Sequence, residues 1–443
     1  MNPRMISILR AATATAAAAS LCAAPLLAQT TPGAPKPAGA YVIRNATIVP
    51  VGGPRITGGT VVMQGGKITA VGATAATPAG ATVIDGTGMF VYPGMINAGT
   101  EIGLSEIESV PGGEDQREVG PFNPHDVALT AVNPFSESIP LPRYNGITSA
   151  LTMPSGGLIS GTASLIDLSG WTPDQMAVKR SVGIVVNYPR VAGGGRGGRG
   201  GGAGAAEAVN AGVKQLQDYF TQARAYADIK AKLAGGAPGK QVIDLPMEAM
   251  IPVVRGELPV IFNAETAGQI RGALAFADSF KLKAIIRGGR EAWQLADTLA
   301  ARKVPVILGP LYAMPDPGSP YDELYATPGV LVKAGVVIAF QTTGATNVRD
   351  LPFEVAMAEP YGLSPDDALK AVTLGAAQIF GVADRYGSIE TGKVANLFVS
   401  NGDPMDPRSN VKYLFIRGEL VPLTDRHTKL YEEFRARPKP PVR

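Results

Sequence analysis

The sequence is poorest in the residues that most often bind metals or form disulfides. Its 443 residues include two histidines, His125 and His427, and a single cysteine, Cys22. A zinc or iron site needs several His, Cys or carboxylate ligands that converge on one point. Two scattered histidines therefore exclude an imidazole-rich metal site, and one cysteine excludes a disulfide within the chain.

Charge is also scarce. Asp, Glu, Lys and Arg make up 17% of the chain and the formal net charge is only +3, so the composition predicts no surface for a nucleic acid or another polyanion. Apolar residues make up 45%, which suffices for one large domain or two ordinary ones with a sizeable core. The 54 glycines and 37 prolines predict many turns and loops.

Residues 1–28 have the pattern of a signal peptide. Arg4 and Arg10 flank a short start, the Ala-rich run AATATAAAASLCAAPLLA follows, and we expect cleavage after Ala28. The run is too short and too rich in alanine for a confident membrane anchor, although a retained N-terminal anchor is the alternative. We therefore expect a periplasmic or secreted protein with no stable membrane span after cleavage. The mature chain would then lack cysteine altogether.

Short β-type segments lie toward both ends of the remaining chain. A Pro/Ala/Gly linker at 29–40 precedes the alternating or apolar runs of 41–92, and similar runs return at 385–423. Short strands separated by turn signals predict a small β-sandwich, which we expect the N- and C-terminal segments to build together. The polar segment 424–443 predicts a surface helix and a tail.

Between these segments, over 93–384, apolar strands alternate with amphipathic helices. The β-rich runs are GITSALTM, VGIVVNY, LPVIFNA, KAIIRGG, VPVILGP and VVIAFQTT, and the helical stretches include AETAGQIRGALAFADSFKL and REAWQLADTLAARKV. Continuous apolar strands predict a parallel sheet that is buried on both faces. About eight such units favour a closed (β/α)8 TIM-like barrel over an open doubly wound sheet.

A Gly/Arg-rich segment, GGGRGGRGGGAGAA at 193–206, follows the run VGIVVNY. Its composition does not allow it to pack into a core. We expect a mobile loop at the C-terminal face of the barrel, where pockets form and where Arg196 and Arg199 would reach the mouth. The alternative is a tolerated insertion without a function.

Other catalytic motifs are missing from the sequence. No Gly-x-Ser-x-Gly elbow is present, and Ser160 has only His125 as a conceivable base. His125 more simply precedes a helix, and His427 lies in the polar C-terminal segment. The Gly-rich stretches GGPRITGG and GGLISG lack the Walker lysine and the dinucleotide-binding spacing.

Two segments carry a family resemblance, VIDGTGMFVYPGMINAGTEIG near the start of the mature chain and YGLSPDDALKAVTLGAAQIFGVADRYGSIETGKVANLFVSNGDP near its end. They are similar to the N-terminal segment and the C-terminal signature of the amidohydrolase superfamily, and nearly all of the mature chain resembles its imidazolonepropionase-like or prolidase-like branch. Further segments resemble its second, fifth and sixth barrel units. The resemblance implies a (β/α)8 barrel with a small β-sandwich. It also implies a hydrolase of C–N bonds that uses zinc or another divalent metal at the strand ends.

The positions where the family places its metal-binding residues are occupied by other residues here. They are Asn97 for the Asp before the first-strand motif, Gly99 and Glu101 for the His-x-His, Asn263 and Gly288 for the fifth- and sixth-strand histidines, and Thr343 or its neighbour for the eighth-strand Asp. The fourth-strand Lys or Glu of the family has no assigned counterpart. Neutral amide and hydroxyl oxygens are weak zinc ligands and one carboxylate does not make a site, so we expect no metal cofactor.

Three hypotheses for the function follow. The first is a metal-free barrel that binds a small molecule or acts as a partner subunit, assembled with an intact amidohydrolase paralogue or with itself. The second is a hydrolase of amide, dipeptide or cyclic amide bonds with Glu101 as base, Glu265 as second carboxylate and Arg287 as clamp for an oxyanion or carboxylate. The alternative is that Glu101 or Glu265 forms a buried ion pair with Arg287 and fills the space of the metal. The third is a metal hydrolase with ligands elsewhere.

Overall fold

The computed structural model describes residues 39–106, 110–189, 203–240, 243–315 and 319–438. The expected signal peptide lies outside these residues, as does most of the Gly/Arg-rich segment, whose last four residues begin helix α4 (Ala203–Ala234). Within the described ranges, none of the helices combines the length and the apolar character that crossing a membrane requires.

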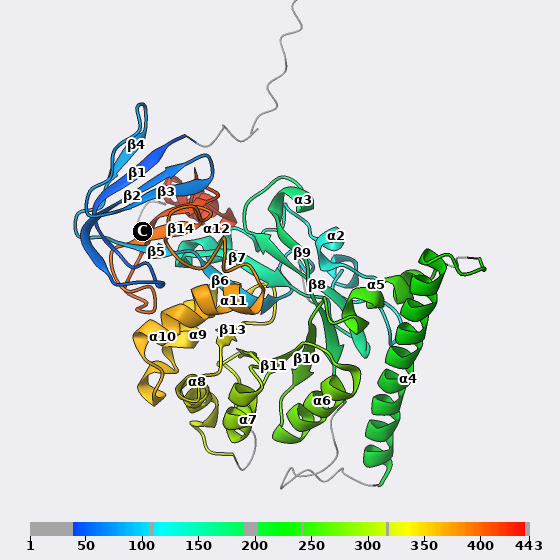
Figure 1. The fold of residues 1–443 in the computed structure, drawn as a ribbon. Helices are drawn as coiled ribbons and strands as arrows, with labels where there is room; N and C mark the ends of the chain where they lie inside the picture. Colours follow the sequence, from blue (N-terminus) through cyan, green and yellow to red (C-terminus); the bar gives the residue numbers. More distant parts are fainter. Residues whose placement is uncertain (1–38, 107–109, 190–202, 241–242, 316–318, 439–443) are drawn as a thin grey trace, which may run out of the picture. The chain divides into compact units, whose positions relative to one another are not determined.

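Strands from both ends of the chain form one continuous eight-stranded sheet (Figure 1). Its order is β16-β15-β14-β5-β1-β2-β3, with β4 paired to β1. The strands are β1 (Tyr41–Ile48), β2 (Ile56–Gln64), β3 (Lys67–Gly72), β4 (Thr82–Asp85), β5 (Phe90–Pro93), β14 (Leu397–Ser400), β15 (Val411–Ile416) and β16 (Glu419–Leu420). The two chain ends meet where β14 pairs antiparallel with β5. The composite β domain predicted from the sequence is thus confirmed.

The middle of the chain forms a second eight-stranded sheet, in the order β6 to β13. Its strands are β6 (Met95–Thr100), β7 (Ile147–Thr152), β8 (Ile159–Asp167), β9 (Ala177–Asn187), β10 (Val260–Ala264), β11 (Ala284–Gly288), β12 (Val306–Leu308) and β13 (Ile338–Phe340). A bridge between Thr100 and Thr343 joins β6 to the chain just after β13, which closes the barrel. The TIM-like barrel predicted from the sequence is confirmed.

One strand departs from the expected repetition of parallel βα units. β8 runs antiparallel to both β7 and β9. The connection between Thr152 and Ile159 is a short turn containing Gly156 and Gly157, whereas a parallel crossover needs about a dozen residues or more. The short connection therefore dictates a hairpin at this point of the barrel.

Helices cover the outside of the parallel part of the barrel (Figure 1). They are α4 and α5 (Leu245–Val254) before β10, α6 (Ala267–Phe280) before β11, η3 (Ala292–Leu295) and α7 (Ala296–Ala301) before β12, and α8 (Glu323–Lys333) before β13. After β13 come η4 (Asn347–Asp350), α9 (Leu351–Ala356), η5 (Glu359–Tyr361), α10 (Pro365–Lys370), η6 (Ala371–Gly375) and α11 (Ala376–Ile379). Shorter elements elsewhere are η1 (Pro111–Gly113), α2 (Ala128–Ala131), η2 (Leu141–Asn145) and α3 (Pro173–Met176).

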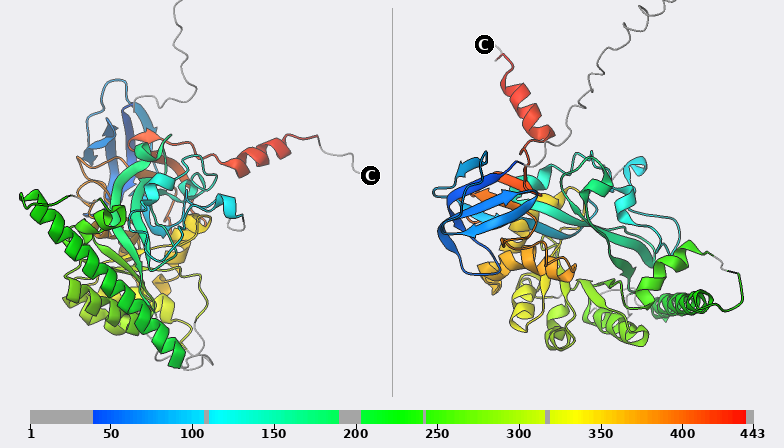
Figure 2. Two further views of the ribbon diagram at one scale, coloured as in Figure 1. Left: turned by 90° about the vertical axis from the view of Figure 1, so that its right-hand side faces the viewer. Right: turned by 45° about the horizontal axis from the view of Figure 1, so that its top comes forward.

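Helix α12 (Arg426–Arg435) follows the last strand and extends away from the rest of the chain (Figure 2). None of its residues is buried. Asp425 caps it, because the Asp425 carboxylate accepts the backbone N–H of Thr428. His427, on this helix, is exposed.

Strand periodicity sorts the barrel side chains into two sets. Successive residues of a strand point to opposite faces, so one set packs outward against the helices and includes Phe262 and Phe340. The other set fills the barrel and includes Ile261, Ile285 and Ala339. At the C-terminal ends of the strands the inward-facing residues are polar instead of apolar.

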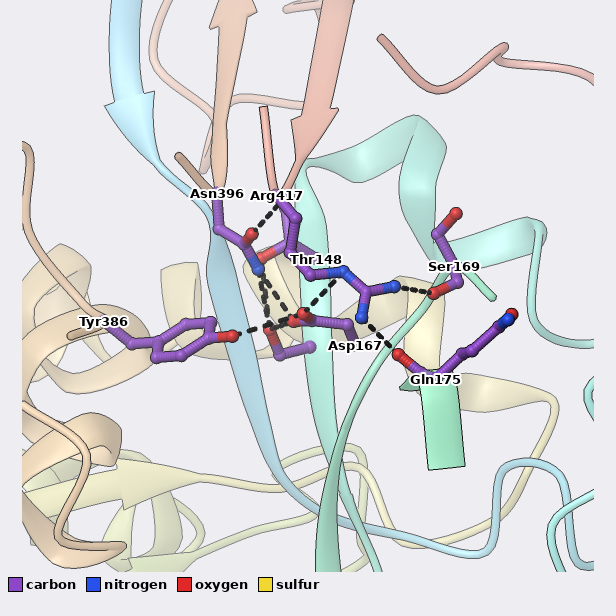
Figure 3. A network of polar contacts seen from close by, with 8 residues as sticks. Thr148, Asp167, Ser169, Gln175, Tyr386, Asn396 and Arg417 are labelled. Carbon is purple, nitrogen blue, oxygen red and sulfur yellow. Dashed lines mark hydrogen bonds and ion pairs between the residues drawn. The ribbon is translucent and has the colours of Figure 1, made fainter. Parts of the chain in front are cut away.

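A buried polar network joins the barrel to the β domain (Figure 3). Asp167, at the end of β8, is 1% exposed. Its carboxylate accepts hydrogen bonds from Ser149 Oγ at 2.9 Å, Asn396 Nδ2 at 2.8 Å and Tyr386 Oη at 3.2 Å. Arg417 Nε lies 3.6 Å from the same carboxylate. The opposite charges of Asp167 and Arg417 are thus paired across the junction of the two sheets.

Candidate functional site

The inward-facing layer at the C-terminal strand ends is polar. Each of its members lies two residues beyond a residue of the apolar inner layer, so strand alternation points both to the same face. The members of this polar layer are Asn187, Asn263, Arg287 and Gln341. They meet at the barrel mouth, which is where barrels of this kind place their functional groups.

Arg287 is the centre of the polar layer. Its Nε donates to Gln341 Oε1 at 2.6 Å and its Nη1 donates to Asn263 Oδ1 at 2.9 Å. A guanidinium has only donors, so both amide oxygens must turn toward it. The amide nitrogens then donate elsewhere, Gln341 Nε2 to the Gly309 carbonyl at 2.8 Å and Asn263 Nδ2 to Asn187 Oδ1. The arginine and the amides therefore fix each other's orientation.

Asn187 extends the network to the loop after β7. Its Nδ2 donates to the carbonyl of Gly157 at 2.8 Å and to Ser160 Oγ at 3.1 Å. The Ser160 hydroxyl donates in turn to the Gly156 carbonyl at 2.7 Å and is buried. Ser160 thus supports the loop, whereas His125 is only near Asp126, with Nε2 3.9 Å from Oδ1. A Ser-His pair is not among the contacts of the described residues.

Two carboxylates act on Arg287. Burial lowers the pKa of Arg287 to about 10, and the charges of Glu265 and then Glu101 oppose that shift. Glu101 follows β6 and is partly buried, while Glu265 follows β10 and is exposed, so a fully buried ion pair does not form. The three residues predicted as catalytic are thus electrostatically coupled at one mouth. Their role in a reaction remains a prediction.

Gly99 and Gly288, where the family resemblance implies histidines, leave no room for a side chain. A Cβ on Gly99 would lie 2.4 Å from Gln341 Oε1 and 2.5 Å from Met153 Cε. A Cβ on Gly288, whose φ is +92°, would lie 2.2 Å from Glu265 Oε1. Both spaces are therefore occupied by residues that surround Arg287 at the mouth.

Asn97 and Thr343, two further ligand positions of the resemblance, hold the barrel closed. Asn97 Nδ2 donates to Thr342 Oγ1 at 2.8 Å, and Asn97 Oδ1 accepts the Gly99 N–H at 3.1 Å. The Thr343 N–H donates to the Gly99 carbonyl at 3.0 Å, and its carbonyl accepts the Glu101 N–H at 3.1 Å. Thr343 has φ of +65°, a conformation that is costly for a β-branched residue.

A divalent metal does not fit the residues described here. In those parts of the chain that the structure places, no three or more His, Cys, Asp or Glu residues are grouped so that they could hold a metal ion. Arg287 already brings a positive charge to the two carboxylates of the mouth, and this charge repels a second cation. The metal chemistry that the family resemblance implies therefore has no described ligand set in this barrel.

Asn187 and Gln341 belong to the polar layer but are not among the site residues predicted from the sequence. Asn187 ends β9, the fourth strand of the barrel, and so occupies the level of the fourth-strand residue that the resemblance left unassigned. Gln341 lies two residues before Thr343 and is the member of that segment that contacts Arg287. Extending the alternation of the apolar strands by two residues would have indicated both.

Two buried polar atoms without a hydrogen-bond partner lie on loops near Asn187. Gln116 Oε1 and Ser155 Oγ are among the buried side-chain atoms that make no hydrogen bond within the described chain. Gln116 and Ser155 lie on adjacent segments, because the Ser155 N–H donates to the Gln116 carbonyl at 2.7 Å. Ser155 directly precedes Gly156 in the loop that Asn187 contacts. Buried polar groups are normally satisfied, so these atoms mark a place that water or a ligand completes.

A cavity of about 140 Å³ lies away from this mouth, beside the first residues of β13. Its lining includes Asp367 and Lys370 of α10 and none of the polar-layer residues. The polar layer is the candidate functional site on a different ground, because it gathers a guanidinium and three amide side chains at the strand ends.

Comparisons with known proteins agree with the fold and with the C-terminal segment. The model of the amidohydrolase family matches residues 322–421. An amidohydrolase structure from Thermotoga maritima is 28% identical with a TM-score of 0.77, over 87% of this chain and 100% of that one. A prolidase solved with N-methylphosphonate-L-proline is similar in fold, with 17% identity, a TM-score of 0.54, and coverage of 86% of this chain and 99% of that one.

Curated relatives are similar over parts of their length. Amidohydrolase tasK of Hapsidospora irregularis is 23% identical over 381 residues, which are 78% of this chain and 38% of that protein. Imidazolonepropionase of Thermoplasma volcanium is 31% identical over 109 residues, which are 23% of this chain and 27% of the relative. The match thus spans well under half of each of these two relatives. Together with the barrel and its composite β domain, these likenesses show that the chain belongs to the amidohydrolase superfamily, and part of it is similar to imidazolonepropionases.

Proposed function

We propose that this amidohydrolase-superfamily barrel binds a small amide-type molecule at its mouth without a divalent metal. The observation that carries the proposal is the fixed network of Arg287, Asn263 and Gln341 at the level where the family resemblance implies metal-binding residues. The network orients a guanidinium whose other N–H groups make no hydrogen bond to the described chain. Such a group is preorganised to receive an oxygen atom of a ligand.

The size and chemistry of the ligand follow from the relatives and from the polar layer. One structural relative was solved with N-methylphosphonate-L-proline, and we propose a compound of similar size for this chain, such as an N-acyl amino acid or a cyclic amide. Its carbonyl or carboxylate oxygen would accept from Arg287. The unpartnered Gln116 Oε1 and Ser155 Oγ offer further hydrogen-bonding positions on the adjacent loops.

The test is binding by protein that has been treated with a chelator. We expect at least one of N-acetyl-L-proline, hydantoin and a Gly-Pro dipeptide to raise the melting temperature, with the same effect before and after EDTA treatment. Binding that disappears with EDTA and returns with zinc would contradict the proposal. R255A changes an exposed arginine at the C-terminal end of α5, outside the polar layer. It is the matched control and should bind as the native chain does.

A second candidate function is hydrolysis without a metal, which the coupling of Glu101 to Arg287 favours. Glu101 would take a proton from a water molecule as the water oxygen attacks the amide carbonyl carbon, and Arg287 would hold the resulting oxyanion. Collapse of this intermediate breaks the C–N bond, and the proton passes from Glu101 to the departing amine. Release of amine that survives chelation and is lost in E101Q would support this candidate. Binding of the compound without release of amine would contradict hydrolysis and would be consistent with the binding function alone.

We also propose that the chain is exported and works in an assembly. The signal-like pattern of residues 1–28 supports export, and the expected product begins at Gln29. The missing metal ligands support assembly with a metal-loaded paralogue or with a second copy. Mass spectrometry of the mature N-terminus tests the first part, and an affinity-tagged chain purified from its own cells tests the second. Full-length protein that stays inside the cell as a monomer would contradict both parts.

A further inference from the structure

The Arg287 guanidinium meets oxygen atoms from several strand ends. Asn263 Oδ1 comes from β10 and Gln341 Oε1 from the residue after β13, at 2.9 and 2.6 Å. The charges of Glu265, just after β10, and Glu101, just after β6, also act on the guanidinium. One cation thus connects three regions of the barrel rim that are far apart in the sequence.

A buried cation is stable only when surrounding groups compensate for lost hydration. The pKa of Arg287, lowered by burial to about 10, is still well above neutrality, so the group keeps its charge at pH 7. The compensation comes from two neutral amide oxygens and from the two carboxylates at longer range. Removing the cation would leave Asn263 Oδ1 and Gln341 Oε1 without the donors of Arg287 and would remove a positive charge that interacts with Glu101 and Glu265.

Gly99 and Gly288 are part of the same arrangement as Arg287 and its acceptors. Gln341 Oε1, which accepts from Arg287, occupies the space that a side chain at position 99 would need, and the Glu265 carboxylate does the same at position 288. A larger residue at position 99 would displace an acceptor of Arg287. The arginine, its acceptors and the small residues are therefore mutually dependent.

We infer that Arg287 is an internal cation that holds the barrel mouth together as a bound metal ion would, and that its removal opens a cation-binding site lined by Glu101, Asn263, Glu265 and Gln341. The guest that fits best is a planar guanidinium, because the acceptors already have the geometry of one. The arrangement does not depend on which ligand the mouth binds.

The experiment is chemical rescue of R287A in the full chain. We expect R287A to melt more than about 3 °C below the native chain, which corresponds to roughly 1 kcal/mol or more. Millimolar methylguanidinium chloride should restore at least half of the loss. Methylammonium chloride at the same ionic strength should restore much less, because it is a compact ion with a different set of donors. R255A is the control, and neither salt should change its melting temperature.

Two outcomes would overturn the inference. One is an R287A protein with native melting temperature and no response to methylguanidinium. The other is equal rescue by both salts, which indicates a general ionic effect. If R287A does not accumulate as folded protein, R287K carries the test, since lysine keeps the charge and loses the planar fork. R287K with native stability would then overturn the inference.

Discussion

Two arginines, one in the β domain and one at the barrel mouth, belong to two different kinds of polar network. Arg417, after β15, lies 3.6 Å from the buried carboxylate of Asp167, which also accepts three hydrogen bonds (Figure 3). Arg287, at the mouth, is bonded to two neutral amide oxygens, and its carboxylates act from farther away. We call the first network closed, because a carboxylate and a guanidinium are paired within it. We call the second open, because its guanidinium is bonded to neutral amides only.

The difference teaches that charge balance, rather than burial alone, separates a structural network from a candidate site. Asp167 is buried, which raises its pKa, while Arg417 and the hydrogen-bond donors lower it. Asn396 and Arg417 of the β domain donate to Asp167 and to the Ser169 carbonyl of the barrel, so this network joins the two. The Arg287 network instead keeps a positive charge oriented at the strand ends, where barrels of this kind place their functional groups.

The largest expected effect comes from breaking the closed network. D167N replaces a buried oxygen that accepts hydrogen bonds with a donor and removes the counter-charge of Arg417, whose side chain is 38% exposed. We expect a loss of about 3–4 kcal/mol in the free energy of unfolding, most of it from the buried donors left without an acceptor. Urea denaturation followed by circular dichroism measures it. The control D174N changes an exposed acidic residue and should stay within about 0.5 kcal/mol of the native chain. A D167N protein as stable as D174N would remove the contrast between the two networks.

A third buried charge, Glu354 of α9, sharpens the comparison because its charged neighbour is another carboxylate, Asp350. Burial raises the pKa of Glu354 to about 7, although the Leu311 N–H, 2.6 Å from Oε2, lowers it in part. The folded chain then binds more protons than the unfolded chain between about pH 4.5 and pH 7. The stability contributed by the protonated group is therefore complete below about pH 4.5 and declines as the pH rises to about 7, by about 3 kcal/mol.

E354Q should remove this pH dependence. We expect the difference in unfolding free energy between E354Q and the native chain to change across this range and to be constant above about pH 8. Denaturant titrations at a series of pH values provide the measurement. Parallel stability profiles for the two proteins would show that Glu354 has an ordinary pKa.

A methyl group added at Gly99 would displace Gln341, which accepts a hydrogen bond from Arg287 in the open network. G99A places a Cβ 2.4 Å from Gln341 Oε1, and we expect a loss of about 1–3 kcal/mol through overpacking. In the Q341A background the same change should cost less, since the nearest obstructing atom is gone and only the flexible end of Met153, at 2.5 Å, still has to move. A double-mutant cycle with no coupling between the two positions would mean that Gln341 does not occupy this space as described.

The smallest effect on stability comes from closing the open network. N263D puts a carboxylate where an amide oxygen now accepts from Arg287 Nη1, but it also removes the Nδ2 donor to Asn187 Oδ1. The charge-assisted bond gained and the hydrogen bond lost should offset each other, so we expect the free energy of unfolding to change by less than about 1 kcal/mol. The same change should weaken any ligand that uses Arg287 by about tenfold or more. Thermal melting and calorimetric titration test the two parts. Unchanged ligand affinity in N263D would place the ligand away from Arg287.

The sequence predicts the architecture better than the arrangement of the site. Apolar runs such as KAIIRGG identify the strands, and the composite β domain follows from similar segments at both ends of the chain. The antiparallel β8 differs because a short Gly-rich turn leaves no length for a crossover. That signal was present in the sequence, but the expectation of regular βα units concealed it.

The site depends on contacts between residues far apart in the chain. Composition and resemblance single out Gly99, Asn263 and Gly288, and the strand pattern places Arg287 beside them. Only the closed barrel reveals that Gln341 lies against Gly99 and accepts from Arg287, because these residues belong to opposite ends of the barrel sequence. The direction of an amide side chain follows from such partners and not from local propensity.

The most direct measurement of the central claim is the zinc content of the native full-length chain, determined by mass spectrometry after incubation with zinc and removal of the unbound ion. An Arg287 cation in place of a metal predicts far less than one zinc per chain, with no difference between the native protein and E101Q. Close to one zinc per native chain, lost in E101Q, would contradict the account.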